Sequence, residues 1–123
     1  MTPVNGTKGT ILIAEDDPDV RKLVATILQD RGFAVILAVD GKQALKRARD
    51  YEGEIAILLT DVEMGKLDGF DLRERLLLER PKVKVVVMSG RLDEEILGED
   101  FPILRKPFSK EALISTIEAQ LRH

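Results

Sequence analysis

The sequence predicts a single α/β domain built on a doubly wound, five-stranded parallel sheet. The chain has 123 residues, in which five short apolar segments alternate with amphipathic segments. This length suits one domain, and apolar runs without alternation are typical of strands buried on both faces. Strands that alternate with helices pair in parallel through right-handed crossovers, so helices must cover both faces of the sheet. Periodicity alone leaves several strand orders open, among them 2-1-3-4-5.

The first strand, expected over 10–14, leads into a helix with a clear start. Asp17 can accept hydrogen bonds from the first free amides, and Pro18 suits the first helical position. One apolar stripe at helical spacing is expected to face the core: Val20, Leu23, Val24, Ile27 and Leu28. Gly32 is expected to end this helix, and the second strand follows over 34–39.

The second and third helices begin at capping aspartates. Asp40 and Gln43 form a variant capping box for a helix to about residue 51. Asp68 caps a helix to about residue 79, before Pro81. The expected inward-facing residues of these two helices are Ala44, Leu45 and Ala48, then Phe70, Leu72, Leu76 and Leu77.

Three further strands complete the predicted sheet, and a last helix follows them. The strands are expected over 55–60, 83–88 and 101–105, the last of them at an edge because Pro102 lacks an amide donor. The acidic segment 91–100 leaves room for a fourth helix of only one or two turns. The last helix begins at Ser109, and its expected apolar face consists of Leu113, Ile114, Ile117 and Leu121.

Composition excludes several classes of function. The net charge of −3 provides no basic excess for nucleic acid, and no apolar run is long enough to span a membrane. The absence of cysteine excludes disulfides and thiolate sites and fits the cytoplasm, where we expect the protein. Residues 1–9 are expected to be a flexible lead-in to a domain over 10–122.

Acidic and polar side chains follow four of the predicted strands. Glu15, Asp16 and Asp17 follow the first strand, and Asp61 follows the third with Glu63 nearby. Ser89 follows the fourth strand and Lys106 the fifth. Parallel strands bring these ends to one edge of the sheet, where α/β folds bind ligands. The crowded carboxylates repel one another, so at least one should have a raised pKa unless a cation is present.

A magnesium ion would relieve the repulsion between these carboxylates, because Mg²⁺ prefers a few oxygen ligands and keeps several waters. Asp16 and Asp61 could bind it directly, the backbone carbonyl of Glu63 could supply a third oxygen, and Glu15 could act through water. This arrangement suits phosphoryl transfer, with Asp61 as the nucleophile. Two further side chains would contact the phosphoryl oxygens, Lys106 through its charge and Ser89 through its hydroxyl.

Four motifs, each at a predicted strand end, resemble those of the receiver domains of bacterial two-component response regulators. They are Glu15-Asp16-Asp17-Pro18 with Arg21, Asp61-Val62-Glu63-Met64 with Asp68-Gly69, Ser89-Gly90, and Lys106-Pro107-Phe108. The resemblance covers about 10–121. It implies the flavodoxin-like order 2-1-3-4-5, a cis bond before Pro107, and Mg²⁺-dependent phosphorylation of Asp61 by a histidine kinase or a histidine phosphotransfer protein. Phosphorylation would alter partner binding on the face of the fourth strand, fifth strand and last helix.

Three positions depart from the family pattern, and one segment is short. Gly65 stands where proline is common, and Glu15 replaces the commoner aspartate. Ile103 stands at the switch position, where many members carry an aromatic residue, so we do not expect the family's usual aromatic coupling. The short segment before Lys106 resembles that of C-terminal receivers in hybrid histidine kinases.

Three other functions compete with this interpretation. A nucleotide-binding domain needs a glycine-rich turn after the first strand, where this chain has three acids. A metal-dependent phosphatase with an aspartate nucleophile stays open, because Glu63 is placed to act as its general acid and base. A pseudo-receiver that only binds partners is disfavoured by the intact acidic pair, Asp61, Ser89 and Lys106.

Overall fold

The computed structural model describes residues 8–65, 67–90 and 102–122 of the chain. Five parallel strands form one sheet in the order β2-β1-β3-β4-β5. The strands are β1 Thr10–Ala14, β2 Ala34–Ala38, β3 Ile57–Asp61, β4 Lys84–Ser89 and β5 Ile103–Arg105. The helices are α1 Pro18–Asp30, α2 Gly41–Asp50, α3 Gly69–Glu79 and α5 Lys110–Leu121. The predicted fold class and strand order are confirmed, while the predicted short fourth helix falls within 91–101, outside the described residues.

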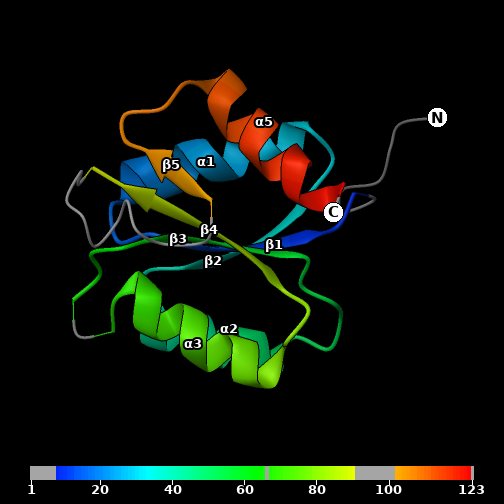
Figure 1. Cartoon of the computed structure of the whole chain (residues 1–123), viewed down its shortest axis with the longest axis vertical. Helices are drawn as coiled ribbons and strands as arrows, with labels where there is room; N and C mark the ends of the chain where they lie inside the picture. Colours follow the sequence, from blue (N-terminus) through cyan, green and yellow to red (C-terminus); the bar gives the residue numbers. More distant parts are fainter. Residues whose placement is uncertain (1–7, 66, 91–101, 123) are drawn as a thin grey trace.

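The sheet is the middle of three layers (Figure 1), with α1 and α5 on one face and α2 and α3 on the other. Successive strand residues point to opposite faces, so each face has its own apolar core. Leu12 and Leu58 pack toward α2 and α3, whereas Ile13 and Leu59 pack toward α1 and α5. All four of these side chains are fully buried. The central strands β1 and β3 are therefore buried on both faces, and a ligand can reach them at the strand ends.

The side chains predicted to cap the helices do so. Asp17 accepts the amide of Asp19 at 2.9 Å, and Asp40 accepts the amide of Gln43 at 2.7 Å. Asp68 caps α3 and Ser109 caps α5 in the same way, each through the amide three residues later. Each cap satisfies an amide that lacks a partner within its helix and so fixes where the helix begins.

Two predicted core residues are on the surface instead. Leu23 of α1 is 58% exposed, and Leu121 at the end of α5 is 41% exposed. In α1 the buried face is centred on Val24, Ala25 and Leu28, which places Leu23 at the border of the stripe. Leu121 is the last residue of its helix, where the final turn has no core left to cover.

Two strands extend one residue beyond the predicted ends. β3 includes Asp61, and β4 includes Ser89. Both residues pair within the ladder, since Asp61 lies opposite Met88 and Ser89 lies opposite Arg105. The two side chains are thus held by regular strand backbone.

Among the described helices, none combines the length and the apolar character that crossing a membrane requires.

Candidate functional site

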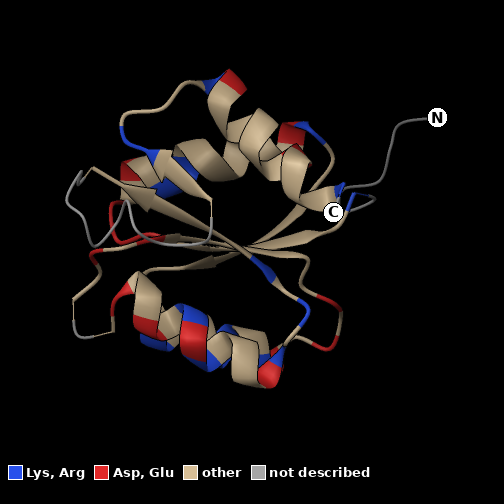
Figure 2. Ribbon diagram, viewed as in Figure 1, with Lys and Arg blue, Asp and Glu red and all other residues tan. Residues whose placement is uncertain are grey.

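An acidic cavity of about 390 Å³ lies at the carboxyl ends of the central strands. Figure 2 shows acidic segments gathered at this end of the sheet, where the loops after β1 and β3 leave it. The cavity is lined by residues from all the predicted motifs: Glu15, Asp16, Asp17, Asp61, Glu63, Ser89, Gly90 and Lys106. The structure therefore brings together the side chains that the sequence placed at separate strand ends.

Lys106 joins the two sides of this cavity. Its Nζ lies 2.5 Å from Oε1 of Glu15 and 3.2 Å from Oδ2 of Asp61. Burial of the ammonium favours its neutral form, but the hydrogen bond to Glu15 and the negative charges of Asp61 and Glu15 outweigh this and raise the pKa of Lys106. Lys106 is therefore a cation that two carboxylates share.

Glu15 is the most constrained acid of the site. It is completely buried, and its second oxygen, Oε2, accepts the amide of Asp17 at 3.1 Å. Burial, together with the charge of Asp61 and a hydrogen bond that protonated Glu15 can donate to the Asp16 carboxylate, raises the pKa of Glu15 to about 7, although Lys106 and the Asp17 amide act in the opposite direction. The predicted raised pKa in the acidic cluster thus belongs to Glu15.

Asp61 is held from its backbone as well as its side chain. It is the last residue of β3 and is only 9% exposed. The Oγ1 of Thr60 donates to the carbonyl oxygen of Asp61 at 2.9 Å, and the next amide, that of Val62, donates to Met88 at 3.1 Å. A carboxylate buried to this degree requires solvation or a charged partner, and Lys106 provides one.

Ser89 and Lys106 are linked through their backbones. The amide of Lys106 donates to the carbonyl of Ser89 at 2.8 Å, which continues the pairing of β4 with β5 beyond Arg105. Ser89 is 1% exposed and lines the cavity beside Asp61. The bond between Lys106 and Pro107 is cis, as expected.

The acidic residues present fit a hard divalent cation. Glu15, Asp16 and Asp61 each offer a carboxylate oxygen, and these oxygens lie within 4.8 Å of one another. Both oxygens of Glu15 already accept hydrogen bonds from the protein, whereas Asp16 is exposed at the mouth of the cavity. This division supports Asp16 and Asp61 as direct ligands and Glu15 as an indirect one, with Mg²⁺ as the ion that such an oxygen set prefers.

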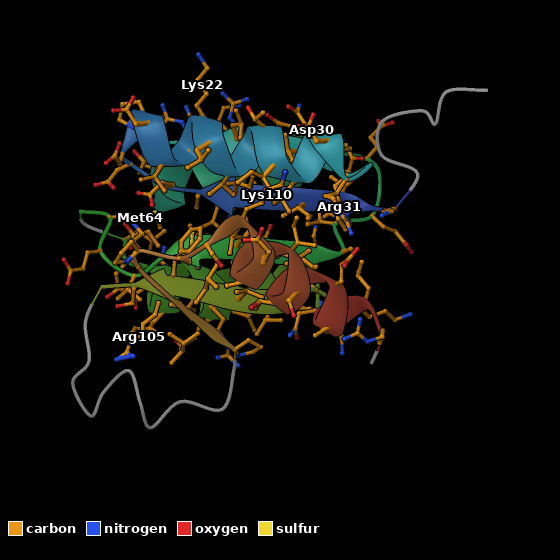
Figure 3. The ribbon with its side chains drawn as sticks, turned by 90° about the horizontal axis from the view of Figure 1, so that it is seen from above. Lys22, Asp30, Arg31, Met64, Arg105 and Lys110 are labelled. Atoms are coloured by element: carbon orange, nitrogen blue, oxygen red, sulfur yellow. The ribbon has the colours of Figure 1, made fainter. Side chains whose placement is uncertain are left out.

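The loop after β3 carries the remaining predicted residues. Glu63 is exposed and lines the acidic cavity. Figure 3 shows Met64, which follows it, at the same end of the sheet as Arg105. Gly65 has a φ of +72°, a conformation that proline cannot adopt. Gly65 therefore allows a backbone conformation that a proline at this position would prevent.

Ile103, at the switch position, lies outside the acidic cavity. It pairs with Val87 of β4 and packs half-buried against the core beneath α2 and α3. Its aliphatic side chain therefore serves as part of the sheet packing in this structure.

Two residues position the site in ways that the sequence did not predict. Nη1 of Arg21 donates to the carbonyl oxygen of Glu15 at 2.8 Å and so anchors the loop after β1 to α1. A Cβ on Gly69 would lie 2.4 Å from the carbonyl oxygen of Asp61, so only glycine lets α3 begin so close to the end of β3. Both residues belong to the motifs described above. The sequence of a motif, however, shows neither which atom the Arg21 guanidinium contacts nor how closely the backbone approaches Gly69.

Comparisons with known proteins agree with this geometry. A family model described as "Response regulator receiver domain" matches residues 11–118. The response regulator GtcR of Aneurinibacillus migulanus is 38% identical over 92% of this chain and 48% of its own length. The sensor kinase CckA of Brucella abortus (strain 2308) is 34% identical over 98% of this chain and 13% of its own length.

A solved structure shows the same fold. The response regulator receiver protein from Sinorhizobium medicae WSM419 superimposes with a TM-score of 0.82 at 26% identity, covering 92% of this chain and 94% of the other. The chain thus spans about half the length of GtcR and a small part of CckA.

Proposed function

This chain belongs to the response regulator receiver domain family, and on that premise we propose that Asp61 accepts a phosphoryl group in a Mg²⁺-dependent reaction. The donor is a phosphohistidine of a sensor histidine kinase or of a histidine phosphotransfer protein. We also propose the cytoplasm as the compartment in which the two meet.

The observation that carries this proposal is the position of Lys106 against Asp61. The ammonium lies 3.2 Å from Oδ2 of a carboxylate that stands at the end of a buried strand and lines an open cavity. A fixed cation beside a nucleophilic carboxylate favours approach of an anionic phosphoryl group. In this arrangement the cation also becomes a partner for the oxygens of the transferred group.

Six residues that line the cavity have a part in the proposed transfer. An oxygen of Asp61 attacks the phosphorus in line with the leaving imidazole nitrogen, the P–N bond breaks and an acyl phosphate forms. Lys106 pairs with one phosphoryl oxygen, and the Ser89 hydroxyl donates to another. Asp16, Asp61 and the Glu63 carbonyl would hold the magnesium ion, with Glu15 acting through water. When bound, the ion would neutralise charge that develops on the phosphoryl oxygens.

The proposed output is a change in partner binding on the surface of β4, β5 and α5. Arg105 is exposed there, and Ile103 and Phe108 are half-buried. The backbone hydrogen bond from the amide of Lys106 to the carbonyl of Ser89 connects this surface to the acidic cavity. Movement of Lys106 toward a phosphoryl group should therefore shift the amide resonances of Ile103, Arg105 and Phe108. Unchanged resonances on phosphorylation would remove the basis for this output surface.

The acyl phosphate can be located by chemical trapping. After incubation with acetyl phosphate and Mg²⁺, borohydride reduces an aspartyl phosphate to homoserine, which peptide mass spectrometry detects. We expect homoserine at position 61. Homoserine at position 16, or 5-hydroxynorvaline at position 63, would instead contradict the proposal. We also expect no steady hydrolysis of an aryl phosphate ester, which distinguishes the acceptor from an aspartate-dependent phosphatase.

A further inference from the structure

A second, larger cavity lies between α2 and α3, next to the acidic one. Its volume is about 720 Å³. Its walls come from α2, the loop after β3 and the middle of α3, and residues that follow β1 and β2 close it. Of the residues that line this cavity, only Asp16 takes part in the proposed phosphoryl transfer. The other lining residues are therefore available for a separate binding function.

The floor of this α2–α3 cavity is apolar. Leu45 and Met64 line it and are at most 5% exposed, as members of the core beneath α2 and α3. Leu67 is half-buried beside them, and Val39 at the rim is 40% exposed. Apolar side chains left in an open hollow offer contact area to an apolar body of matching size.

The rim of the cavity is cationic. Lys42, Arg49 and Arg75 line it, and Arg49 is already paired with Glu79 at 2.8 Å. Within the ranges that the structure describes, Lys42 and Arg75 form no ion pair. They come from different helices and flank the same apolar floor.

The two acids of the lining offset part of this charge. Asp40 is the cap of α2, and its side chain accepts the Gln43 amide. Asp16 belongs also to the acidic cavity, where it is proposed to bind the metal. With three cations against these two acids, the formal charge of the lining is positive, next to an apolar floor.

We propose that the α2–α3 cavity binds a small organic anion with an apolar body. The acidic group of the ligand lies between Lys42 and Arg75, and its apolar part contacts Val39 and Leu67 above the buried Leu45 and Met64. Charge complementarity and an apolar contact surface together define this class of ligand. The binding does not depend on phosphorylation, so it should persist in the Asp61→Asn variant.

Anilinonaphthalene sulfonate is a suitable probe, because it joins an apolar ring system to one anionic group and its fluorescence rises in apolar surroundings. We expect saturable binding to the native chain. The Lys42→Ala/Arg75→Ala double variant should bind the probe about tenfold more weakly, since two exposed charge contacts are lost. A Lys22→Ala/Lys110→Ala variant removes two exposed lysines from α1 and α5 and should bind as the parent does. Phenylnaphthylamine, which lacks the sulfonate, should bind the parent more weakly.

Amide resonances locate the probe. We expect shifts at Val39, Lys42, Leu67 and Arg75, together with a higher midpoint of thermal unfolding, which shows that the probe binds the folded chain. Equal affinity in both double variants, equal affinity for the neutral analogue, or shifts confined to α1 and α5 would each overturn the proposal. Loss of probe binding in Asp61→Asn would also overturn it. Loss of phosphorylation alone leaves it standing.

Discussion

The Nζ of Lys106 lies closer to Glu15, at 2.5 Å, than to Asp61, at 3.2 Å. The lysine that is proposed to pair with a phosphoryl oxygen is thus closer to the buried carboxylate of Glu15 than to the proposed phosphoacceptor. Glu15 is fully buried, and the side chain of Lys106 is 25% exposed. The pair therefore couples the electrostatics of the acidic cavity to the stability of the fold.

Removal of the lysine should expose this coupling. Lys106→Met leaves the buried Glu15 without its cation, and we expect the free energy of unfolding at pH 8 without Mg²⁺ to fall by about 2 kcal/mol. Urea denaturation measures the change. Lys110→Met, at an exposed position of α5, is the control and should have little effect. The double variant Lys106→Met/Glu15→Gln should regain most of the loss, and failure to do so would show that Glu15 is not the partner that matters.

The stability of the Mg²⁺-free chain should depend on pH through Glu15. Its pKa is about 7 in the folded chain against an ordinary value of 4.5. Between these values the folded chain binds more protons than the unfolded chain, so the free energy of unfolding falls as the pH rises through this window. Glu15→Gln removes that contribution. The difference in unfolding free energy between the parent and Glu15→Gln should therefore change between pH 4.5 and pH 7, and a constant difference would contradict the raised pKa.

Asp16 should control the response of stability to metal. In Asp16→Asn one charge near Glu15 is gone, so the metal-free chain should gain stability, by on the order of 1 kcal/mol or less because Asp16 is exposed. Millimolar Mg²⁺ should raise the urea midpoint of the parent through binding to the folded state but not that of the variant. Asp19→Asn, an exposed aspartate of α1 outside the acidic cavity, should respond to Mg²⁺ as the parent does. An equal Mg²⁺ response in the Asp16 variant would exclude Asp16 as a ligand.

Gly69 should tolerate no side chain. In Gly69→Ala the new Cβ would meet the carbonyl oxygen of Asp61 at 2.4 Å, so either α3 or the end of β3 must shift. We expect a loss of about 2 kcal/mol in the free energy of unfolding and slower phosphorylation of Asp61. Gly90→Ala is a matched control on the other side of the cavity, because a Cβ there meets nothing within 4 Å. Equal stability of the two variants would mean that the close approach imposes no constraint.

The sequence alone places Asp61, Ser89 and Lys106 near one another, because the carboxyl ends of parallel strands lie at the same edge of the sheet in any strand order. The same reasoning could not find the contact between Lys106 and Glu15, which depends on how far two side chains reach across the sheet. It was wrong about Leu23 and Leu121, because helical spacing gives the apolar stripe but not which part of it meets a core of finite width. The α2–α3 cavity was not predicted either, since a hollow depends on the sizes of side chains from three separate segments.

Intact mass after incubation with acetyl phosphate shows whether Asp61 is the phosphoacceptor. The parent chain and Asp61→Asn are compared, each with Mg²⁺ and with a chelator. We expect a gain of one phosphoryl group in the parent with Mg²⁺ only, and no gain in the variant. A gain that persists in Asp61→Asn, or that is equal with the chelator, would contradict this role of Asp61.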